Sequence, residues 1–367
     1  MSEQQLRMAA DLFDPTRLRI ARQASMLQKK DLAERVGVSA GAISQYENGS
    51  SSPSPKVIAS LALALGVPGS FFAGDRPLGE APVTSAHFRS LRSTSKRERD
   101  RAFAHALLTW ELSGVIERYV RLPKYDLPSG LSVRPKDPPS AIEGAARRAR
   151  SALELGTGPL PHIVRLLESR GAVCTRLPAR TRRVFAFSCD FPSRPVVVLS
   201  TERSHRAAGR FDAAHELGHL LLHDDGEPGT HAVERQANVF ASEFLAPASE
   251  IADFLPSKVD WKRLMELKES WGISMQALLF RARSLRVMPE YTYRRAVTEL
   301  NRRGWRTKEP GDDGEAEEPV MLRRAIELIE EQGRSVDDLS DESRLSIETI
   351  ELIAPPDNRP KLDLGAE

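Results

Sequence analysis

The sequence predicts a mainly α-helical protein of the α+β class with more than one domain. Most apolar residues recur at helical spacing, and only two short β-branched or aromatic runs interrupt them. A chain of 367 residues is long enough for two or three packed domains. The expected segments are a small helical domain at 1–75, a linker with a long helix at 76–149, a larger domain with a small β-sheet at 150–290, and an acidic helical region at 291–367.

Proline, serine and glycine mark the predicted helices of the first segment. Pro15 fits the first turn of a helix, and Ser39 can cap the helix that follows the turn at Gly37. A strongly apolar stretch ends at Gly66, as helices often do.

The helices expected along the whole chain are 15–27, 30–36, 40–48, 56–65, 98–122, 140–155, 161–170, 211–223, 233–245, 261–267, 275–285 and 321–332. Short strands are expected at 184–187 and 196–199, and a flexible segment at 306–320.

The composition excludes several classes of protein. Hydrophobic residues make up 40% and charged residues 28% of the chain, which is typical of a globular protein. The longest apolar stretch, 57–67, is too short to cross a bilayer, and the N-terminus lacks a secretory signal pattern. Cys174 and Cys189 cannot form a disulfide framework. We therefore expect no membrane association and a cytoplasmic location.

The net charge of +2 conceals a basic middle and an acidic end. Residues 76–205 carry 23 basic and 12 acidic side chains, whereas residues 306–367 carry 8 and 18. This asymmetry indicates either contact with nucleic acid or charge pairing between the two segments. A third interpretation is that the acidic end only solvates the chain.

One spacing of apolar residues and serine occurs three times. It describes a helix, a tight turn, a serine N-cap and a second helix, with apolar residues meeting between the helices. The copies are Leu32, Val38, Ser39 and Ile43, then Leu267, Ile273, Ser274 and Leu278, then Leu339, Leu345, Ser346 and Ile350. Any compact helix-turn-helix packs in this way, whether or not it binds DNA.

The first copy has the wider surroundings of a DNA-binding domain. Residues 15–75 resemble the Xre-type helix-turn-helix domain of phage repressors. The matching residues are Arg17-Leu18, Ala21-Arg22, Asp31-Leu32-Ala33, Gly37-Val38-Ser39, Ile43–Gly49, Pro53, Leu61-Ala62 and Leu65-Gly66-Val67. The resemblance implies five helices, with residues 40–48 in the major groove of an operator bound by a homodimer.

The residues expected to contact DNA depart from the common pattern, because Lys29 and Ala40 stand where glutamine is frequent. Methyl contacts and side-chain hydrogen bonds to base edges remain available, together with cationic contacts to phosphates. The expected DNA-binding residues are Arg17, Lys29 and Lys30 for phosphates, and Ser39, Ala40, Gly41, Ala42, Ser44 and Gln45 on the recognition helix. A helix-turn-helix that binds protein is the alternative, since residues 1–75 have a net charge of only +1.

The strongest chemical signal is the run His215-Glu216-Leu217-Gly218-His219. Histidines four residues apart lie on one face of a helix, so both imidazoles can bind one metal ion. Glu216 can reach a water molecule at that metal. Catalytic zinc needs a third protein ligand and one open position.

Four residues are candidates for the third ligand: His223, His231, Glu234 and Glu243. His223 lies about 6 Å of helical rise beyond His219, too far to join the same tetrahedron easily. Glu234 and Asn238 share one face of the next helix, and a carboxylate there has the best geometry. His231 remains a candidate because it precedes that helix.

Residues 150–290 resemble the ImmA/IrrE family of metallopeptidases, which cleave bacterial repressors. The matching residues are Arg210-Phe211, Ala214–Leu220, His223, Glu234–Asn238, Phe240-Ala241, Phe244-Leu245 and Pro247. The resemblance implies a zincin-like fold, Zn²⁺ held by His215, His219 and Glu234, and Glu216 as the general base. The whole chain resembles Xre–ImmA fusion regulators of bacteria.

Two functions are consistent with these features. The first is a DNA-binding transcriptional regulator with a zinc-dependent endopeptidase domain that cleaves a repressor or antitoxin. The second is a non-proteolytic transcription factor whose peptidase-like domain senses a metal or small ligand. For the peptidase we expect the substrate to pair along Pro195–Ser200. The group that stabilises the oxyanion is open among His223, His231 and Tyr125, each of which can instead have a supporting role.

Overall fold

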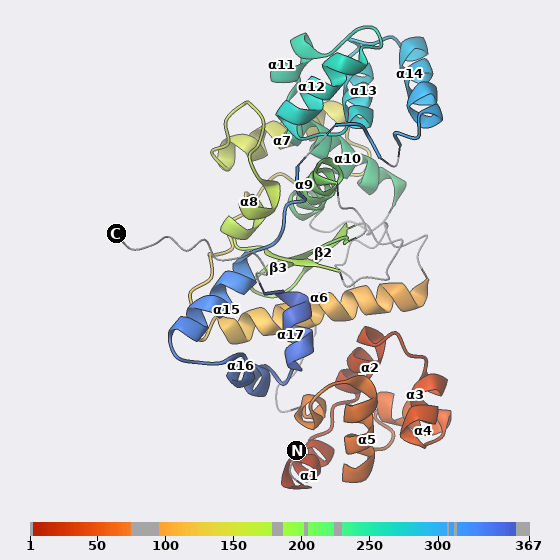
Figure 1. The fold of residues 1–367 in the computed structure, drawn as a ribbon, viewed down its shortest axis with the longest axis vertical. Coiled ribbons are helices and arrows are strands. Elements are labelled where there is room, and N and C mark those ends of the chain that lie inside the picture. Colours follow the sequence, from red (N-terminus) through yellow and green to blue (C-terminus); the bar gives the residue numbers. More distant parts are fainter. Residues whose placement is uncertain are drawn as a thin grey trace. The chain divides into compact units, whose positions relative to one another are not determined.

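The computed structural model describes residues 3–74, 95–177, 186–201, 205–223, 230–306, 308–311 and 314–356 (Figure 1). The chain forms two compact units. The first unit comprises Met1–Ala81, Asp100–Leu122 and Val320–Glu367, and the second comprises Pro82–Arg99 and Pro123–Pro319. Helices and one three-stranded sheet account for the regular structure, which confirms the predicted fold class.

The N-terminal part of the first unit is a helical domain with the predicted caps. Ser39 accepts a hydrogen bond from the backbone N–H of Ala42, and Gly37 ends the preceding helix with a left-handed backbone at φ 75°. Leu32 and Ile43 are fully buried between these helices. The elements are α1 (Glu3–Asp11), α2 (Pro15–Ala24), α3 (Lys29–Val36), α4 (Ala40–Glu47), α5 (Pro55–Leu65) and the 3₁₀ helix η1 (Gly69–Phe72). Helix α1 lies outside the elements that the sequence predicted.

The rest of the first unit comes from distant parts of the sequence. Its elements are α6 (Lys96–Ile116), α15 (Met321–Glu331), α16 (Val336–Ser343) and α17 (Ile347–Ile353). Tyr119 donates a hydrogen bond to Glu342, which joins the end of the α6 segment to α16. Ser346 caps α17, so the third copy of the repeated spacing is also a helix, turn and capped helix. The expected region 291–367 is therefore divided, because α14 belongs to the second unit.

The second unit contains a small mixed sheet in the order β1-β3-β2. Strand β3 (Pro195–Leu199) pairs in parallel with β1 (Val173–Arg176) and antiparallel with β2 (Ala186–Asp190). Both sides of β3 are therefore occupied. The prediction that a substrate peptide pairs along Pro195–Ser200 is wrong, because that strand has no free hydrogen-bonding edge.

The other described elements of the second unit are helices. They are α7 (Pro139–Ala152), α8 (Ile163–Ser169), α9 (Arg206–Leu222), α10 (His231–Leu245), α11 (Ala248–Ile251), the 3₁₀ helix η3 (Ala252–Phe254), α12 (Trp261–Trp271), α13 (Met275–Ser284) and α14 (Glu290–Arg302). Helix α9 packs against β2 and β3 on one side and against α10 on another (Figure 1). A Cβ at Gly218 would lie 3.0 Å from the ring of Phe240, so this glycine lets α10 approach α9 closely.

Acidic residues of the segment before α15 pair with basic residues of the second unit. Glu317 is buried, accepts hydrogen bonds from the first backbone N–H groups of α8, and pairs with Arg210. Glu318 pairs with Arg176 at 2.9 Å. Charge pairing therefore explains part of the asymmetry between basic and acidic segments of the sequence.

In the part of the chain that the structure describes, no helix is long and apolar enough to cross a membrane.

Candidate metal centre

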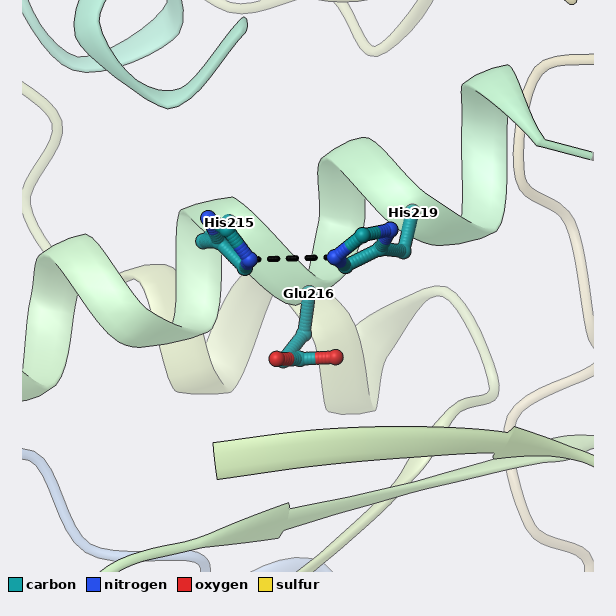
Figure 2. Close-up of side chains that lie close together, drawn as sticks. All are labelled: His215, Glu216 and His219. Atoms are coloured by element: carbon teal, nitrogen blue, oxygen red, sulfur yellow. Dashed lines mark hydrogen bonds between the residues drawn. The ribbon is translucent and has the colours of Figure 1, made fainter. Parts of the chain in front are cut away.

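The middle of α9 carries three side chains that could bind a metal ion. The ligand atoms of His215, Glu216 and His219 all lie within 4.8 Å of one another. The Nε2 atoms of the two histidines are 3.0 Å apart and point toward each other along one side of the helix (Figure 2). The carboxylate of Glu216 points away from the helix axis towards the strands (Figure 2). The spacing of four residues thus places both imidazoles at one point, as predicted.

Helix α10 brings Glu234 to the same point. Its Oε2 lies 3.4 Å from Nε2 of His215, and its Oε1 lies 3.6 Å from Nε2 of His219. Thr230 caps α10 by accepting a hydrogen bond from the N–H of Val233, which sets the start of the helix. Together with the close packing at Gly218, this start places Glu234 in the first turn, opposite the histidines.

The three side chains fit a tetrahedral metal ion. Ligands at about 2.0–2.1 Å from zinc lie roughly 3.3 Å from one another in a tetrahedron. The two imidazole nitrogens are 3.0 Å apart, and each lies 3.4 or 3.6 Å from one oxygen of the Glu234 carboxylate, which is close to this spacing. Among the described residues, Oε1 of Glu234 is also buried without a hydrogen-bond partner. A cation bound to that oxygen would offset the free-energy cost of burying a polar atom without a partner.

Hydrogen bonds to the second ring nitrogens select the tautomers that a metal needs. Nδ1 of His215 lies 3.1 Å from Oδ1 of Asn238, an acceptor. With a metal bound, His215 would therefore carry its proton on Nδ1 and bind the ion through the lone pair of Nε2.

A chain of hydrogen bonds fixes the tautomer of His219 in the same way. Gln236 donates its amide N–H to the carbonyl of Arg134 at 2.7 Å, so its Oε1 accepts from Nε2 of His223 at 3.2 Å. Nδ1 of His223 must then accept from Nδ1 of His219, 3.1 Å away. With a metal bound, Nε2 of His219 would then be the unprotonated nitrogen that binds the ion. His223 thus orients a candidate ligand and is not itself at the cluster.

Burial changes the acidity of the two groups beside the candidate ligands. Glu216 is 3% exposed, and burial raises its pKa to about 7, although His215 and the hydroxyl of Ser188 oppose the rise. Ser188, on β2, donates a hydrogen bond of 2.8 Å to Oε2 of Glu216. For His215, burial opposes the charged form. The hydrogen bond that His215 donates to Glu234 and the nearby carboxylates outweigh burial and raise the pKa of His215.

The other candidate residues from the sequence lie elsewhere. Glu243 is fully buried and pairs with Arg281 and Arg147. His231 is an exposed residue at the start of α10. The backbone of Tyr125 packs against Gly171, at the start of the sheet. Glu234 is therefore the candidate third ligand that lies beside both histidines.

In the first unit, most residues predicted to contact DNA share the surface around α4. Lys30, Ser39, Ala40, Gly41 and Gln45 are exposed, and Lys29, Ala42 and Ser44 are partly exposed. Nζ of Lys29 donates to the hydroxyl of Ser44 at 3.3 Å, which joins the start of α3 to the middle of α4. These side chains therefore form one continuous surface.

Arg17 does not share that surface, which corrects the prediction that it contacts phosphates. Only 2% of its side chain is exposed, and its guanidinium lies over the ring of Phe71 and donates to Glu111 at 2.9 Å. Glu47 also has a structural role, since it accepts hydrogen bonds from Arg22 and joins α2 to α4.

Two family models match this chain. Residues 168–283 match the model of a peptidase family described as an IrrE N-terminal-like domain, and residues 18–72 match a helix-turn-helix model. The chain joins a helix-turn-helix domain to an IrrE N-terminal-like domain. No curated protein matches it. The two matches confirm the resemblance that the sequence motifs indicated, and they make the chain a DNA-binding protein with a peptidase domain.

Two side chains of the IrrE N-terminal-like domain were not anticipated from the sequence. Ser188 is the one hydroxyl in the strand Ala186–Asp190, and a polar residue among buried neighbours was the available signal. Gln236 follows Glu234 by two residues, so the helical pattern alone places it on another face. Its role depends on Arg134, about a hundred residues earlier in the chain, and only the tertiary structure reveals it.

The relay through His223 predicts a measurable effect on metal affinity. In His223→Ala the ring of His219 loses the acceptor that fixes its tautomer. We expect zinc affinity to fall about 10- to 100-fold, as measured by competition with a chromophoric chelator. His231→Ala is the matched control, because it removes an exposed histidine from the same region. A loss of affinity in the control alone would make His231, rather than the relay, the relevant residue.

Proposed function

We propose that this chain is a bacterial, cytoplasmic transcriptional regulator whose peptidase domain is a zinc-dependent endopeptidase that cleaves a repressor or antitoxin protein. The proposal depends chiefly on one observation: two imidazoles from α9 and a carboxylate from α10 converge, and a buried carboxylate lies beside them. His215, His219 and Glu234 would hold the zinc ion. A metal that served only for sensing would not need the fourth side chain, Glu216.

The proposed mechanism assigns the proton transfers to Glu216. When bound, zinc supplies Lewis-acid chemistry, which makes water more acidic and polarises the peptide carbonyl. Glu216 accepts the proton of the attacking water and returns it to the leaving amine. Burial raises the pKa of this carboxyl to about 7 in the metal-free site, and a bound cation would favour the charged form that accepts a proton. The hydroxyl of Ser188 holds the carboxylate in place from β2.

The cleavage assay follows from this proposal. The zinc-loaded chain is incubated with repressor or antitoxin proteins encoded beside its gene, and the fragments are identified by mass spectrometry. We expect one or a few defined cuts, which disappear when a chelator removes the metal and return when zinc is added. Cleavage that persists in excess chelator would contradict a metal-dependent peptidase.

For DNA we propose that α4 enters the major groove of an operator. Lys29 and Lys30 would contact phosphates, and the methyl groups of Ala40 and Ala42 would contact thymine. The remaining residues proposed at this surface are Ser39, Gly41, Ser44 and Gln45. Arg17 is not part of this proposal, because it is buried.

We expect the full-length chain to bind a roughly palindromic duplex as a homodimer. Footprinting on the region upstream of its own gene should reveal two half-sites, and light scattering should give the mass of a dimer on one duplex. A single protected half-site with a monomer bound would contradict the dimer.

A further inference from the structure

The segment from Arg283 to Arg306 of the second unit is rich in arginine. It contains seven arginines, two glutamates, no lysine and no aspartate, a net charge of +5 over 24 residues. The surrounding segment 206–305 as a whole carries equal numbers of basic and acidic residues, so a count over long segments hides this concentration. Most of the segment is α14, and its start is the end of α13.

One face of α14 presents two of these arginines to solvent. Tyr291, Arg295, Thr298 and Arg302 recur at helical spacing, and all four are exposed. Tyr291 is 70% exposed. Ala296 and Leu300 lie on the opposite side of the helix and are buried in the core of the unit. We call the four exposed residues the arginine face.

Intramolecular ion pairs account for only some of the arginines. Glu290 pairs with Arg283 and Arg294, and Glu299 pairs with Arg303. Within the described ranges, the other four arginines of the segment have no acidic partner within ion-pair distance. They are Arg286, Arg295, Arg302 and Arg306.

Contacts with aromatic rings support several arginines of this segment. The guanidinium of Arg295 lies 5.7 Å from the ring centre of Tyr291. Arg303 lies over both Trp261 and Trp305, at 5.5 and 4.7 Å from their ring centres. Stacking orders a guanidinium while leaving its edge able to donate hydrogen bonds.

We propose that the arginine face binds the phosphate backbone of duplex DNA, as a second DNA contact separate from the helix-turn-helix domain. Arginine and tyrosine are among the side chains that contact phosphates in protein–DNA complexes. Arg295 and Arg302 are seven residues apart, about 10 Å along the helix, and the phosphates of a duplex succeed one another more closely than that along its axis. The two guanidinium groups can therefore bind phosphates of one strand at the same time.

Charge and composition favour DNA over a protein partner. Arginine and tyrosine are enriched in protein–protein interfaces as well as at phosphates, so net charge and the amount of apolar surface distinguish the two kinds of partner. The core of a protein–protein interface is largely apolar, whereas duplex DNA presents a continuous row of negative charges. Between 283 and 306, Tyr291 is the one strongly exposed large apolar side chain among the described residues. The chain also contains a DNA-binding domain, so duplex DNA is available to the second unit whenever that domain is bound.

The test compares two double variants of the full-length chain. Arg295→Ala with Arg302→Ala removes two charges from the arginine face, and alanine keeps the helix stable. Arg148→Ala with Arg165→Ala removes two exposed arginines from α7 and α8 of the same unit, so the change in net charge is equal. Binding to a duplex from upstream of the gene and to an unrelated duplex is measured by fluorescence anisotropy over a range of salt concentrations.

We expect the first variant to bind both duplexes more weakly, on the order of tenfold at low salt. The slope of log affinity against log salt should become shallower by about 0.9 for each phosphate that the variant no longer neutralises. The control variant should behave as wild type. Circular dichroism should show both variants folded.

Other outcomes would overturn the proposal. Equal weakening in both variants would mean that only net charge matters. Unchanged DNA binding in the first variant, with loss of binding to a cleaved protein, would assign the face to a protein partner. Gln45→Ala separates this proposal from the role of α4, because it should weaken only the upstream duplex. A wild-type chain that binds neither duplex would contradict both proposals.

Discussion

Glu216→Gln is expected to lower peptide hydrolysis by about 10² or more while zinc stays bound. Glutamine has nearly the same volume as glutamate, and the proposed ligands His215, His219 and Glu234 are unchanged. The variant lacks only a group that can accept a proton from the attacking water. Turnover of a protein substrate and zinc content measured on the same preparation provide the test.

The same variant separates the peptidase from a metal sensor. If proteolysis carries regulation, Glu216→Gln should lose regulation of a reporter gene in cells, as His219→Ala should. A reporter that responds normally in Glu216→Gln but not in His219→Ala would contradict the protease proposal. Metal sensing would then be the better explanation.

His219→Ala is expected to abolish tight metal binding. A site with three protein ligands becomes one with two, and the loss should be visible as less than about one zinc per chain by elemental analysis. His215→Ala should behave in the same way. Glu234→Gln should weaken zinc binding without removing it entirely, because a neutral amide is a poorer ligand than a carboxylate. Unchanged metal content in both histidine variants would exclude this site.

Zinc binding should also depend on pH. A metal must displace the proton from His215, whose raised pKa makes the protonated form more stable in the metal-free protein. The affinity for zinc should therefore fall as the pH is lowered through the range in which His215 becomes protonated.

DNA binding through α4 should survive the substitutions at Glu216, His219, His215 and Glu234, because α4 belongs to the other compact unit.

Local signals in the sequence were sufficient for most helices and for the motif on α9. Serine N-caps and left-handed glycines are decided by neighbouring residues, so Ser39, Ser274 and Ser346 cap their helices as the repeated spacing predicts. The helical period alone places His215 and His219 on one face. Strand β1 was missed because it is only four residues long and pairs with a strand about twenty residues later.

Contacts between distant segments account for what the sequence did not reveal. Arg17 has the sequence signature of a DNA contact, but Glu111, 94 residues later, holds it in the core. The central position of β3 depends on β1 and β2 lying on opposite sides of it. The acidic residues before α15 include Glu317, which is buried because Arg210 and the start of α8 come to meet it.

The sequence by itself determined the two domain types, the helix face shared by His215 and His219, and Glu216 as the carboxylate next to the first histidine. Only the tertiary structure decided that Glu234 meets those histidines, that His223 and Gln236 orient one of them, and that Ser188 holds Glu216. The physical reason is one of range. Helical period and capping act within a few residues, whereas tautomers, burial and pKa values are set by side chains that packing brings together from different elements.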